Sequence, residues 1–381
     1  MSTTASIASA VLTIDLDAIV ANWRWLQAMV SPAECAAVVK ANAYGLGVAA
    51  VAPALAAADC RTFFVSSVDE GIHLRCILGL PPPAKRHRSA KSAAIYLLNG
   101  LISGCEADLT AHELQPVLNS LAEIDAWTAH ARRLDRPLPA AIQVDTGMSR
   151  LGLPPEELAI VATDRQRLQG IQLTAIVSHL ACAEAPSHHL NALQLSRFRD
   201  ALTRLPPARP SLANSSGILL GTDYHGRLVR PGIALYGGAP RPEEANPMQP
   251  VLRLEGRVLQ VRTIDAATTV GYGATHQSAR RERIATVAVG YADGYLRSLS
   301  SRGTGYIGDR PVPLVGRVSM DLITFDVSGL PEADVRPGTP IELIGPHHSV
   351  DAVASDAGTI AYEILTSLGS RYRRVYTRSG A

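Results

Sequence analysis

Eight short runs of apolar residues, each ending on a polar or charged residue, recur along the first 230 positions. The first run is CAAVVK, at positions 35–40, which is too short for a helix and apolar up to its last residue. Such runs are typical of parallel strands covered by helices on both faces, because neither face meets water. We therefore predict eight strands that end close to the following residues: Lys40, Ser66, Asn99, Asn119, Asp145, His179, Asn214 and Arg230.

Stretches with the apolar spacing of helices accompany most of these runs. Apolar residues recur at helical spacing from position 16 to 26, and Asp15 or Asp17 can cap this helix. Later helical stretches cover positions 69–78, 121–134 and 188–205. Eight strand–helix units in about 230 residues match a (β/α)8 barrel in number and length. We therefore predict an α/β fold with a TIM-type barrel at positions 1–240.

The sequence changes character after Tyr236. A connector rich in glycine and proline, GGAPRPEEANPMQP, is followed by short alternating runs such as LRLEGRVLQVRTI and RIATVAVGYA. This alternation predicts strands, and helical spacing returns in TIAYEILTSLG near the end of the chain. We predict a second, mainly β domain at positions 241–381.

Composition and charge argue against several classes of protein. The chain has 381 residues and a formal net charge of +2, so its charge gives no reason to expect nucleic acid as a partner. It has no basic leader and no apolar run of about 18 residues, which argues against a signal peptide and a membrane span. Its five cysteines lack metal-ligand spacing, so we expect reduced thiols, no metal site and a cytoplasmic location. A basic loop at positions 81–94 is expected to be a solvated insertion rather than a docking site for an acidic partner.

Lys40 is the most unusual of the predicted strand ends. Lysines are usually exposed, so on the first run alone a solvated Lys40 is the simpler interpretation. In a barrel, however, the carboxyl ends of the strands meet at one face, where catalytic residues gather. A partly desolvated lysine there has a lowered pKa and a free amine for Schiff-base chemistry. Tyr44 and the glycines around it allow a hydroxyl and the backbone to approach an anion closely.

Eight sequence motifs, in order between Ile14 and Tyr376, resemble those of the alanine racemases, which use pyridoxal 5′-phosphate (PLP). The motifs are VVKANAYGLG, QVDTGMSRLG, SHLACAE, ANSSG, RPGIALYG, VGYGATH, GYADGYLR and VGRVSMD. The resemblance implies a PLP-binding barrel, a β-rich second domain and a homodimeric isomerase that interconverts L- and D-alanine. D-alanine is a peptidoglycan precursor, and the sequence leaves open whether the enzyme serves D-alanine biosynthesis or D-alanine breakdown.

The resemblance also implies a role for each site residue. Lys40 carries PLP through its amine and is one of two catalytic bases, and Tyr272 of the second subunit is the other. Arg150 bonds the phenolic oxygen of the cofactor and, with Tyr291 and Met320, lines the substrate pocket. The phosphate is held by Tyr44, Ser215, Gly232 and Ile233, and the remaining cofactor contacts come from His179, Asn214 and Arg230.

Arg230 bears on the type of reaction. The resemblance implies that it donates to the pyridine nitrogen of PLP, while His179 lies against the ring. An arginine cannot accept a proton, so that nitrogen stays neutral and the cofactor is a weaker electron sink. A less stabilised carbanion is quickly reprotonated at Cα, which favours racemisation over transamination. Racemisation also needs bases on opposite faces of Cα, and Tyr272 needs a nearby cation to act as one, for which Arg297 is a candidate.

The chain departs from the family pattern at two positions. Gln143 stands where many members have a carbamylated lysine that orients the neighbouring arginine. A glutamine cannot be carbamylated, so either its amide bonds Arg150 or an anion such as chloride takes that place, and activity should not depend on bicarbonate. Ser370 stands where some members have a phosphate-binding tyrosine, which puts one phosphate contact in question. Asp145 and Thr146 lie inside a motif, but a structural role in a turn explains them as well as a role in the site does.

Three alternatives remain open at this stage. The first is a PLP racemase of broader specificity or one that prefers serine, because pocket size cannot be read from the sequence. A PLP barrel decarboxylase would need a different second catalytic residue, and the GYGAT motif argues against it. A PLP-binding protein without turnover would usually lack the β domain. An assay for D-alanine formation against carbon dioxide release distinguishes these alternatives.

Overall fold

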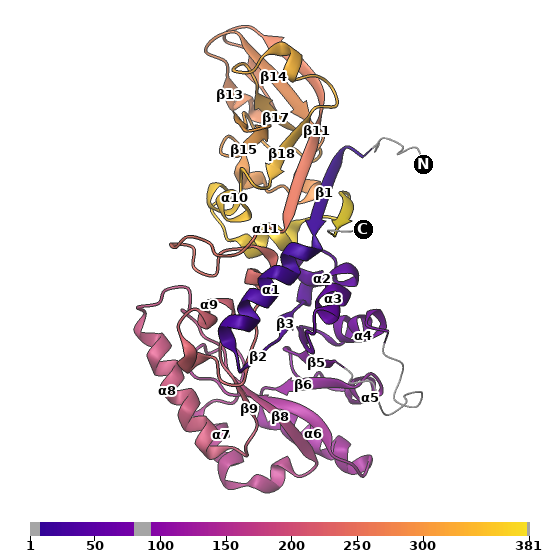
Figure 1. Ribbon diagram of the computed structural model, residues 1–381, viewed down its shortest axis with the longest axis vertical. Coiled ribbons are helices and arrows are strands. Elements are labelled where there is room, and N and C mark those ends of the chain that lie inside the picture. The colour runs from indigo at the N-terminus through magenta and orange to yellow at the C-terminus, as the bar shows by residue number, and fades with distance from the viewer. Residues whose placement is uncertain (1–7, 80–92, 379–381) are drawn as a thin grey trace.

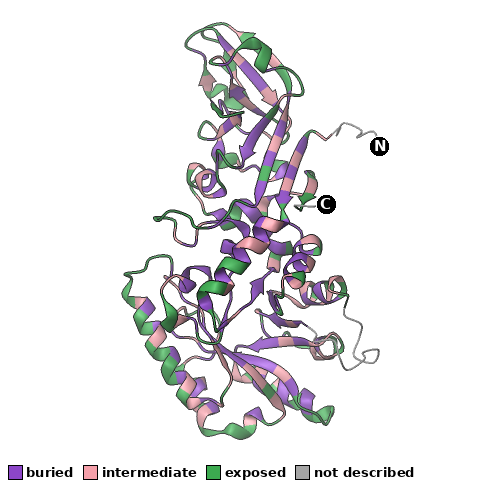
Figure 2. Ribbon diagram, viewed as in Figure 1, coloured by how far each residue is buried: buried purple, intermediate pink, exposed green. Residues whose placement is uncertain are grey.

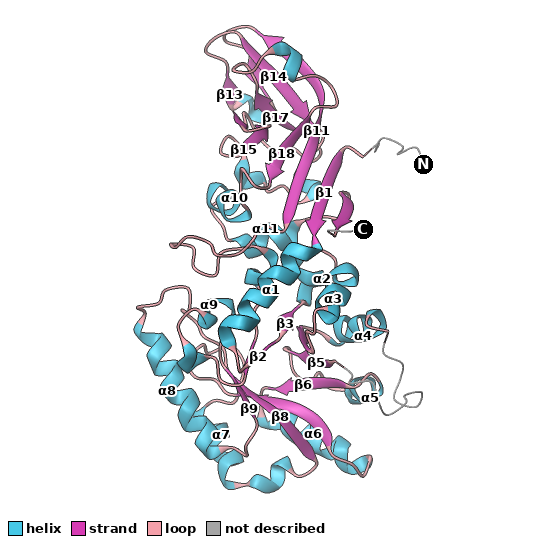
Figure 3. Cartoon of the chain, in the orientation of Figure 1, coloured by secondary structure: helices cyan, strands magenta, loops and turns pink. Residues whose placement is uncertain are grey.

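The computed structural model describes residues 8–79 and 93–378. The molecule is elongated, with a barrel surrounded by helices at one end and a region of strands at the other (Figures 1 and 3). Most of the predicted basic loop, positions 81–92, lies outside the described residues. No described helix is long and apolar enough to cross a membrane.

Parallel strands form the barrel, as predicted. Seven of them, β3 to β9, pair in chain order in one sheet, and β10 pairs with β2. The N–H of Arg227 donates to the carbonyl of Pro210 (2.9 Å), which joins β10 to β9 and closes the ring. The strands are β2 (Glu34–Cys35), β3 (Ala37–Val38), β4 (Thr62–Val65), β5 (Ala94–Leu97), β6 (Leu114–Leu118), β7 (Leu138–Gln143), β8 (Ile171–Val177), β9 (Arg209–Ser211) and β10 (Leu228–Val229).

The predicted strand ends are confirmed. Each of the eight polar residues lies one to three positions beyond the last residue of an observed strand. The strands are mostly buried toward their carboxyl ends, whereas the helices outside them are exposed on their outer faces (Figure 2). The polar residues therefore mark where the chain leaves the apolar interior at one end of the barrel.

Helices follow the strands and cover the barrel. Asp15 caps α1, because its carboxylate accepts from the N–H groups of Asp17 (2.9 Å) and Ala18 (3.0 Å). The predicted helices at 69–78, 121–134 and 188–205 are confirmed as α4, α6 and α8. The bounds of the helices around the barrel are α1 (Leu16–Val30), α3 (Val48–Ala57), α4 (Val68–Ile77), α5 (Glu106–Ala111), α6 (Leu121–Arg133), α7 (Pro155–Thr163), α8 (His189–Arg204) and α9 (Ser215–Ile218).

The second region is mainly β, as predicted. Its eight-stranded sheet is built around β11, which pairs with β1, β14 and β18. Two helices, α10 (Val350–Ala357) and α11 (Ala361–Ser367), lie between this sheet and the barrel (Figure 1). The strands of the sheet are β1 (Ala10–Asp15), β11 (Leu252–Ile264), β14 (Glu282–Val287), β15 (Thr304–Ile307), β16 (Arg310–Pro313), β17 (Ile323–Asp326), β18 (Pro340–Ile344) and β19 (Arg373–Thr377).

The first strand of the chain belongs to this second sheet. β1 pairs antiparallel with β11 and parallel with β19, so the two ends of the chain lie side by side. This pairing places residues 10–15 with the β region rather than with the barrel. The predicted division of the chain at residue 240 does not anticipate it, and that division stays a prediction.

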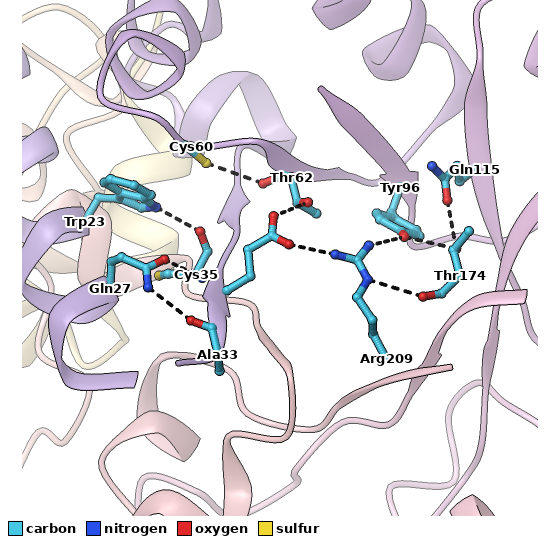
Figure 4. Close-up of polar contacts among 11 residues, drawn as sticks. Trp23, Gln27, Ala33, Cys35, Cys60, Thr62, Tyr96, Gln115, Thr174 and Arg209 are labelled. Carbon is cyan, nitrogen blue, oxygen red and sulfur yellow. Dashed lines mark hydrogen bonds and ion pairs between the residues drawn. The ribbon is translucent and has the colours of Figure 1, made fainter. Parts of the chain in front are cut away.

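Polar side chains join the amino ends of several barrel strands (Figure 4). Arg209 donates to Glu34 Oε2 (2.7 Å) and to the hydroxyl of Tyr96 (2.8 Å). The hydroxyl of Thr62 donates to the other oxygen of Glu34 (2.5 Å), and the hydroxyl of Tyr96 donates to Thr174 (3.0 Å). Glu34, Thr62 and Arg209 each begin a strand, so this network ties the amino ends of β2, β4 and β9 together.

Candidate active site

A cavity of about 850 Å³ lies at the carboxyl ends of the barrel strands. Its volume is within the range of small-molecule and cofactor sites. All nine positions that the resemblance assigned to cofactor binding line it: Lys40, Tyr44, Arg150, His179, Asn214, Ser215, Arg230, Gly232 and Ile233.

Lys40 enters the cavity from an unusual turn. It begins α2 (Lys40–Tyr44), and the four residues that follow it have left-handed backbone angles, with φ between 51° and 55°. Gly45 ends the turn at φ 82°, where a Cβ would lie 2.3 Å from the carbonyl oxygen of Leu365. The turn places Lys40 and Tyr44 on the same cavity. Burial and the charge of Arg150 lower the pKa of Lys40, which increases the fraction of the amine that is unprotonated.

Arg230 is a buried cation without a carboxylate partner among the described residues. Its Nη1 donates to the carbonyl and hydroxyl of Ser211 (both 2.7 Å), and its Nη2 donates to the carbonyl of Ser178 (2.7 Å). Nη2 also donates to Nδ1 of His179 (3.3 Å). Within residues 8–79 and 93–378, its Nε–H has no hydrogen-bond partner. Arg230 therefore keeps one donor for a neutral acceptor in the cavity, which fits the pyridine nitrogen of PLP.

His179 is neutral in this environment. Burial, together with the charges of Arg230, Arg150 and Lys40, lowers its pKa to about 3. Burial also lowers the pKa of Arg230 to about 10, which leaves the guanidinium charged at neutral pH. The ring of His179 is therefore an uncharged surface beside a buried cation, which suits contact with a flat heteroaromatic ring.

Short loops after β9 and β10 form an anion-binding corner. The hydroxyl of Ser215 accepts from the N–H groups of Gly232 (2.9 Å) and Ala234 (3.3 Å). Ile233 begins the short helix η4 (Ile233–Tyr236), so its N–H has no partner within that helix. Asn214 caps α9 by accepting from the N–H of Gly217 (2.9 Å), which gives it a structural role as well as a place on the cavity wall. Hydroxyl and N–H donors gathered in this way fit a phosphate.

Tyr362 is a cavity residue that sequence reasoning missed. It lies on α11, lines the cavity and packs against the ring of Tyr44, with centroids 6.0 Å apart. Ser370, where the family pattern suggested a missing tyrosine, is exposed and is not part of the cavity wall. Tyr362, eight positions earlier, is the second tyrosine that lines the cavity. Tyr362 lies within TIAYEILTSLG, the stretch that the sequence predicts to be helical, and this is where the sequence could have indicated it.

Gln143 does not contact Arg150 as one hypothesis required. Its amide donates to the carbonyl of Leu151 (3.0 Å), and the side chain is buried. Asp145 and Thr146 are structural, as one interpretation held. The carboxylate of Asp145 accepts from three successive N–H groups beginning at Gly147, and the hydroxyl of Thr146 bonds that of Ser178 (2.7 Å).

Tyr272, Tyr291 and Met320 do not line this cavity. They lie in the β region and are 73%, 43% and 53% exposed. Tyr272 begins a turn between β12 (Thr269–Val270) and β13 (His276–Gln277), and β13 lies at the end of the molecule away from the barrel (Figure 1). The N–H of Tyr291 donates to the carbonyl of Ser319 (3.0 Å), beside Met320.

A second arginine lies close to the turn that carries Tyr272. Arg317 places its guanidinium beside Gly273, where an added Cβ would lie 3.1 Å from Nη1. Arg297 is exposed, and no contact with Tyr272 is seen for it in the described part of the chain. Arg317 is therefore a second candidate for the cation that assists Tyr272, and Arg297 stays a prediction.

Gly232→Ala is expected to weaken PLP binding by roughly 10- to 100-fold, because a Cβ at this position would lie 2.2 Å from the hydroxyl of Tyr44. The tyrosine must then leave the anion-binding corner. Titration of the cofactor-free protein with PLP, followed by quenching of protein fluorescence, measures the effect. Gly329→Ala is the matched control, because a methyl group there meets no atom within 4 Å. Equal affinity of the two variants would contradict this account of the corner.

Fold and site together define an α/β-barrel protein with a lysine in a cofactor-sized cavity and a β-rich second region. Residues 14–240 match the alanine racemase N-terminal domain family, and residues 251–376 match the alanine racemase C-terminal domain family. The chain belongs to the alanine racemase family, and it is a racemase, a type of isomerase.

Individual relatives agree with this assignment. The chain is 50% identical over 373 residues to a catabolic alanine racemase of Agrobacterium fabrum, covering 98% of this chain and 93% of that protein. It is 51% identical over 370 residues to an alanine racemase of Rhodospirillum rubrum, covering 97% of this chain and 96% of that protein. The crystal structure of alanine racemase from Bartonella henselae with covalently bound pyridoxal phosphate superposes with a TM-score of 0.91, at 44% identity, covering 97% of this chain and 100% of that one.

Proposed function

We propose that this chain interconverts L- and D-alanine and that Lys40 holds PLP in the cavity. The observation that carries the proposal is the convergence of all nine predicted cofactor positions on one cavity, with Lys40 among them. The covalently bound pyridoxal phosphate of the Bartonella henselae relative supports the same cofactor. When bound, PLP supplies the electron sink that makes the α-proton of an amino acid acidic.

The side chains of the cavity divide the work of binding. Tyr44, Tyr362, the hydroxyl of Ser215 and the N–H of Ile233 would hold the phosphate, and the N–H of Gly232, which donates to the hydroxyl of Ser215, would orient that hydroxyl. Arg230 would donate its Nε–H to the ring nitrogen, and His179 would support the ring without adding charge. Arg150 would bond the phenolic oxygen and orient the substrate. Gln143 donates its amide N–H to the carbonyl of Leu151, which leaves its Oε1 as an acceptor for Arg150, and an anion such as chloride is the other candidate for orienting Arg150.

Two bases act on opposite faces of Cα. Lys40 takes or returns the α-proton with its amine, and Tyr272 does so with its hydroxyl. Tyr272 is 73% exposed and lies outside the cavity of its own chain, so a second copy must supply it. Tyr291 and Met320 share its exposed position and would enter the same cavity from the partner. The enzyme is therefore proposed to act as a homodimer in the cytoplasm.

The test of this function is direct. The purified protein is incubated with L-alanine, and D-alanine and carbon dioxide are measured together. We expect D-alanine to form until both isomers are equal and no carbon dioxide to be released. Carbon dioxide release in place of D-alanine would overturn the proposal. A panel of L-amino acids that includes serine measures specificity, and sedimentation at equilibrium measures the dimer.

The biological direction of the reaction is a separate question. The Agrobacterium fabrum relative is a catabolic alanine racemase, and the Pseudomonas aeruginosa structure, 35% identical with a TM-score of 0.88, is that of a biosynthetic one. Both directions use the same site. A role in supplying D-alanine as a peptidoglycan precursor is expected to show as a D-alanine requirement when the gene is deleted.

A further inference from the structure

The carboxylate of Glu70 joins two neighbouring strand ends beside Lys40. Glu70 lies in the first turn of α4 and is half-buried. Its Oε1 accepts from the N–H of Ala41 (2.6 Å), which is the residue directly after Lys40. Its Oε2 accepts from the N–H of Ser66 (2.8 Å), which is the residue directly after β4. One side chain therefore ties the peptide that follows Lys40 to the end of the next strand.

Local helix chemistry explains how Glu70 reaches this position. The hydroxyl of Ser67 caps α4 by accepting from the N–H of Glu70 (3.3 Å). A serine cap followed three residues later by a glutamate is a capping arrangement that turns the carboxylate back toward the start of the helix. In Glu70 only one carboxylate oxygen, Oε2, accepts a hydrogen bond at the start of the helix, from the N–H of Ser66. The other oxygen is directed to Ala41 on the preceding loop.

The turn that Glu70 holds is strained. Left-handed backbone angles are unfavourable for residues other than glycine, and four such residues follow Lys40 in succession. Such a turn persists only when its surroundings hold it. The far end of the turn is held by Asn42, which accepts from the N–H of Val48 (2.8 Å), and by Arg374, which donates to the carbonyl of Gly45 (3.0 Å). Glu70 holds the end that carries Lys40.

Glu70 also places a negative charge near Lys40. Burial and Arg150 lower the pKa of Lys40, and Glu70 acts in the opposite direction. The neutral ring of His179 adds no charge. The other charged side chains that face Lys40 across the cavity are Arg150, Arg230, Glu184 and Glu363.

We propose that Glu70 is a positioning residue for Lys40, whose carboxylate holds the peptide after Lys40 and so sets the direction from which the amine enters the cavity. This inference rests on the proposed role of Lys40 as the residue that holds PLP. It assigns Glu70 no contact with substrate or cofactor, and Glu70 is not part of the cavity wall.

The chain contains a matched control for this arrangement. Glu123, in the first turn of α6, accepts from the N–H of Asn119 (3.0 Å), directly after β6, and from the N–H of Leu101 (3.0 Å) on the loop after β5. Its own N–H donates to the hydroxyl of Ser120, which caps α6 (3.2 Å). The same capping pattern therefore ties two neighbouring strand ends where no lysine is present.

The test compares Glu70→Gln with Glu123→Gln in the full-length protein. Each change keeps the size of the side chain, removes its charge and replaces one acceptor oxygen by an NH₂ donor. Hydrogen exchange of the backbone around residues 41–47 is measured first, because it does not depend on the cofactor. The rate at which cofactor-free protein captures PLP through Lys40 is then measured as a function of pH, together with the thermal unfolding midpoint.

We expect both variants to lose stability to a similar degree. Only Glu70→Gln should accelerate exchange at residues 41–47 and slow PLP capture, by about tenfold or more, because a misdirected amine reacts slowly. The pH midpoint of capture should also move down, since the removed charge had raised the pKa of Lys40. If hydrogen exchange, the capture rate and the pH midpoint of Glu70→Gln all match those of Glu123→Gln, the proposal is overturned and Glu70 has a structural role alone.

Two further results keep the inference separate from the proposed function. If wild-type protein captures PLP at a residue other than Lys40, the proposed function fails regardless of Glu70. If Glu70→Gln does not fold, Glu70→Asp takes its place, because it keeps the charge but shortens the reach to Ala41. That variant should slow capture with an unchanged pH midpoint, and a wild-type capture rate would overturn the proposal.

Discussion

Tyr272→Phe is expected to reduce racemisation by about 10² or more while PLP binding and the fold are retained. The change removes a single hydroxyl and keeps the aromatic ring, so the packing of the side chain is retained. It also leaves every residue of the cavity in place, since Tyr272 does not line it. The bound cofactor spectrum and the unfolding midpoint should therefore match the wild type. Tyr306→Phe is a suitable control, because Tyr306 lies in the same region and stacks on His347.

Proton exchange in deuterated water shows which base is lost. Lys40 is expected to handle the α-proton of D-alanine and Tyr272 that of L-alanine. The Tyr272→Phe variant should therefore still exchange the α-proton of D-alanine and should lose exchange for L-alanine. Exchange of both isomers at the wild-type rate would show that another group is the second base.

Mixed dimers test whether the site is shared between subunits. Neither Tyr272→Phe nor Lys40→Ala should racemise alanine alone. After subunit exchange, one site of each mixed dimer carries an intact Lys40 and an intact Tyr272 from the partner, so activity should partly return. A mixture that stays inactive although exchange is shown by differently tagged subunits would contradict a shared site.

Lys40→Ala is expected to abolish covalent attachment of PLP and to lower racemisation by at least about 10²–10⁴. The reason is twofold, because Lys40 is both the attachment point and one of the two bases. The fold should survive, since the amine of Lys40 forms none of the hydrogen bonds seen in the described part of the chain. Borohydride reduction followed by peptide mapping measures attachment, and the loss of yellow colour measures cofactor content.

The small number of lysines makes this experiment decisive. The chain has three, Lys40, Lys85 and Lys91. A double variant with Lys85→Arg and Lys91→Arg should keep the label, the colour and the activity. A label that persists in Lys40→Ala, or that disappears in the double variant, would assign the attachment to another lysine.

The strand ends were the part of the site that the sequence predicted best. A strand covered on both faces must stay apolar until it leaves the barrel, so the polar residue at its end is a local signal. Lys40, His179 and Arg230 were found in this way, and the structure brings all three to one cavity. The resemblance then assigned roles that position alone does not reveal.

The partners of these residues were predicted less well. Gln143 donates to the carbonyl of Leu151, and the second tyrosine that lines the cavity is Tyr362, whereas Ser370 is not part of the cavity wall. In both cases the sequence supplied a suitable side chain. Which neighbour it meets depends on how a loop or a helix from another part of the chain packs against the barrel.

Local periodicity and residue chemistry were enough to predict the barrel, the β-rich region after it, a lysine at the first strand end and an arginine with no carboxylate in its motif. Tertiary structure alone decided that β1 joins β11 and β19, that Glu70 holds the peptide after Lys40, and that Tyr272 lies outside its own chain's cavity. These contacts join residues far apart in the chain. They depend on strand register and helix packing, which no local pattern encodes.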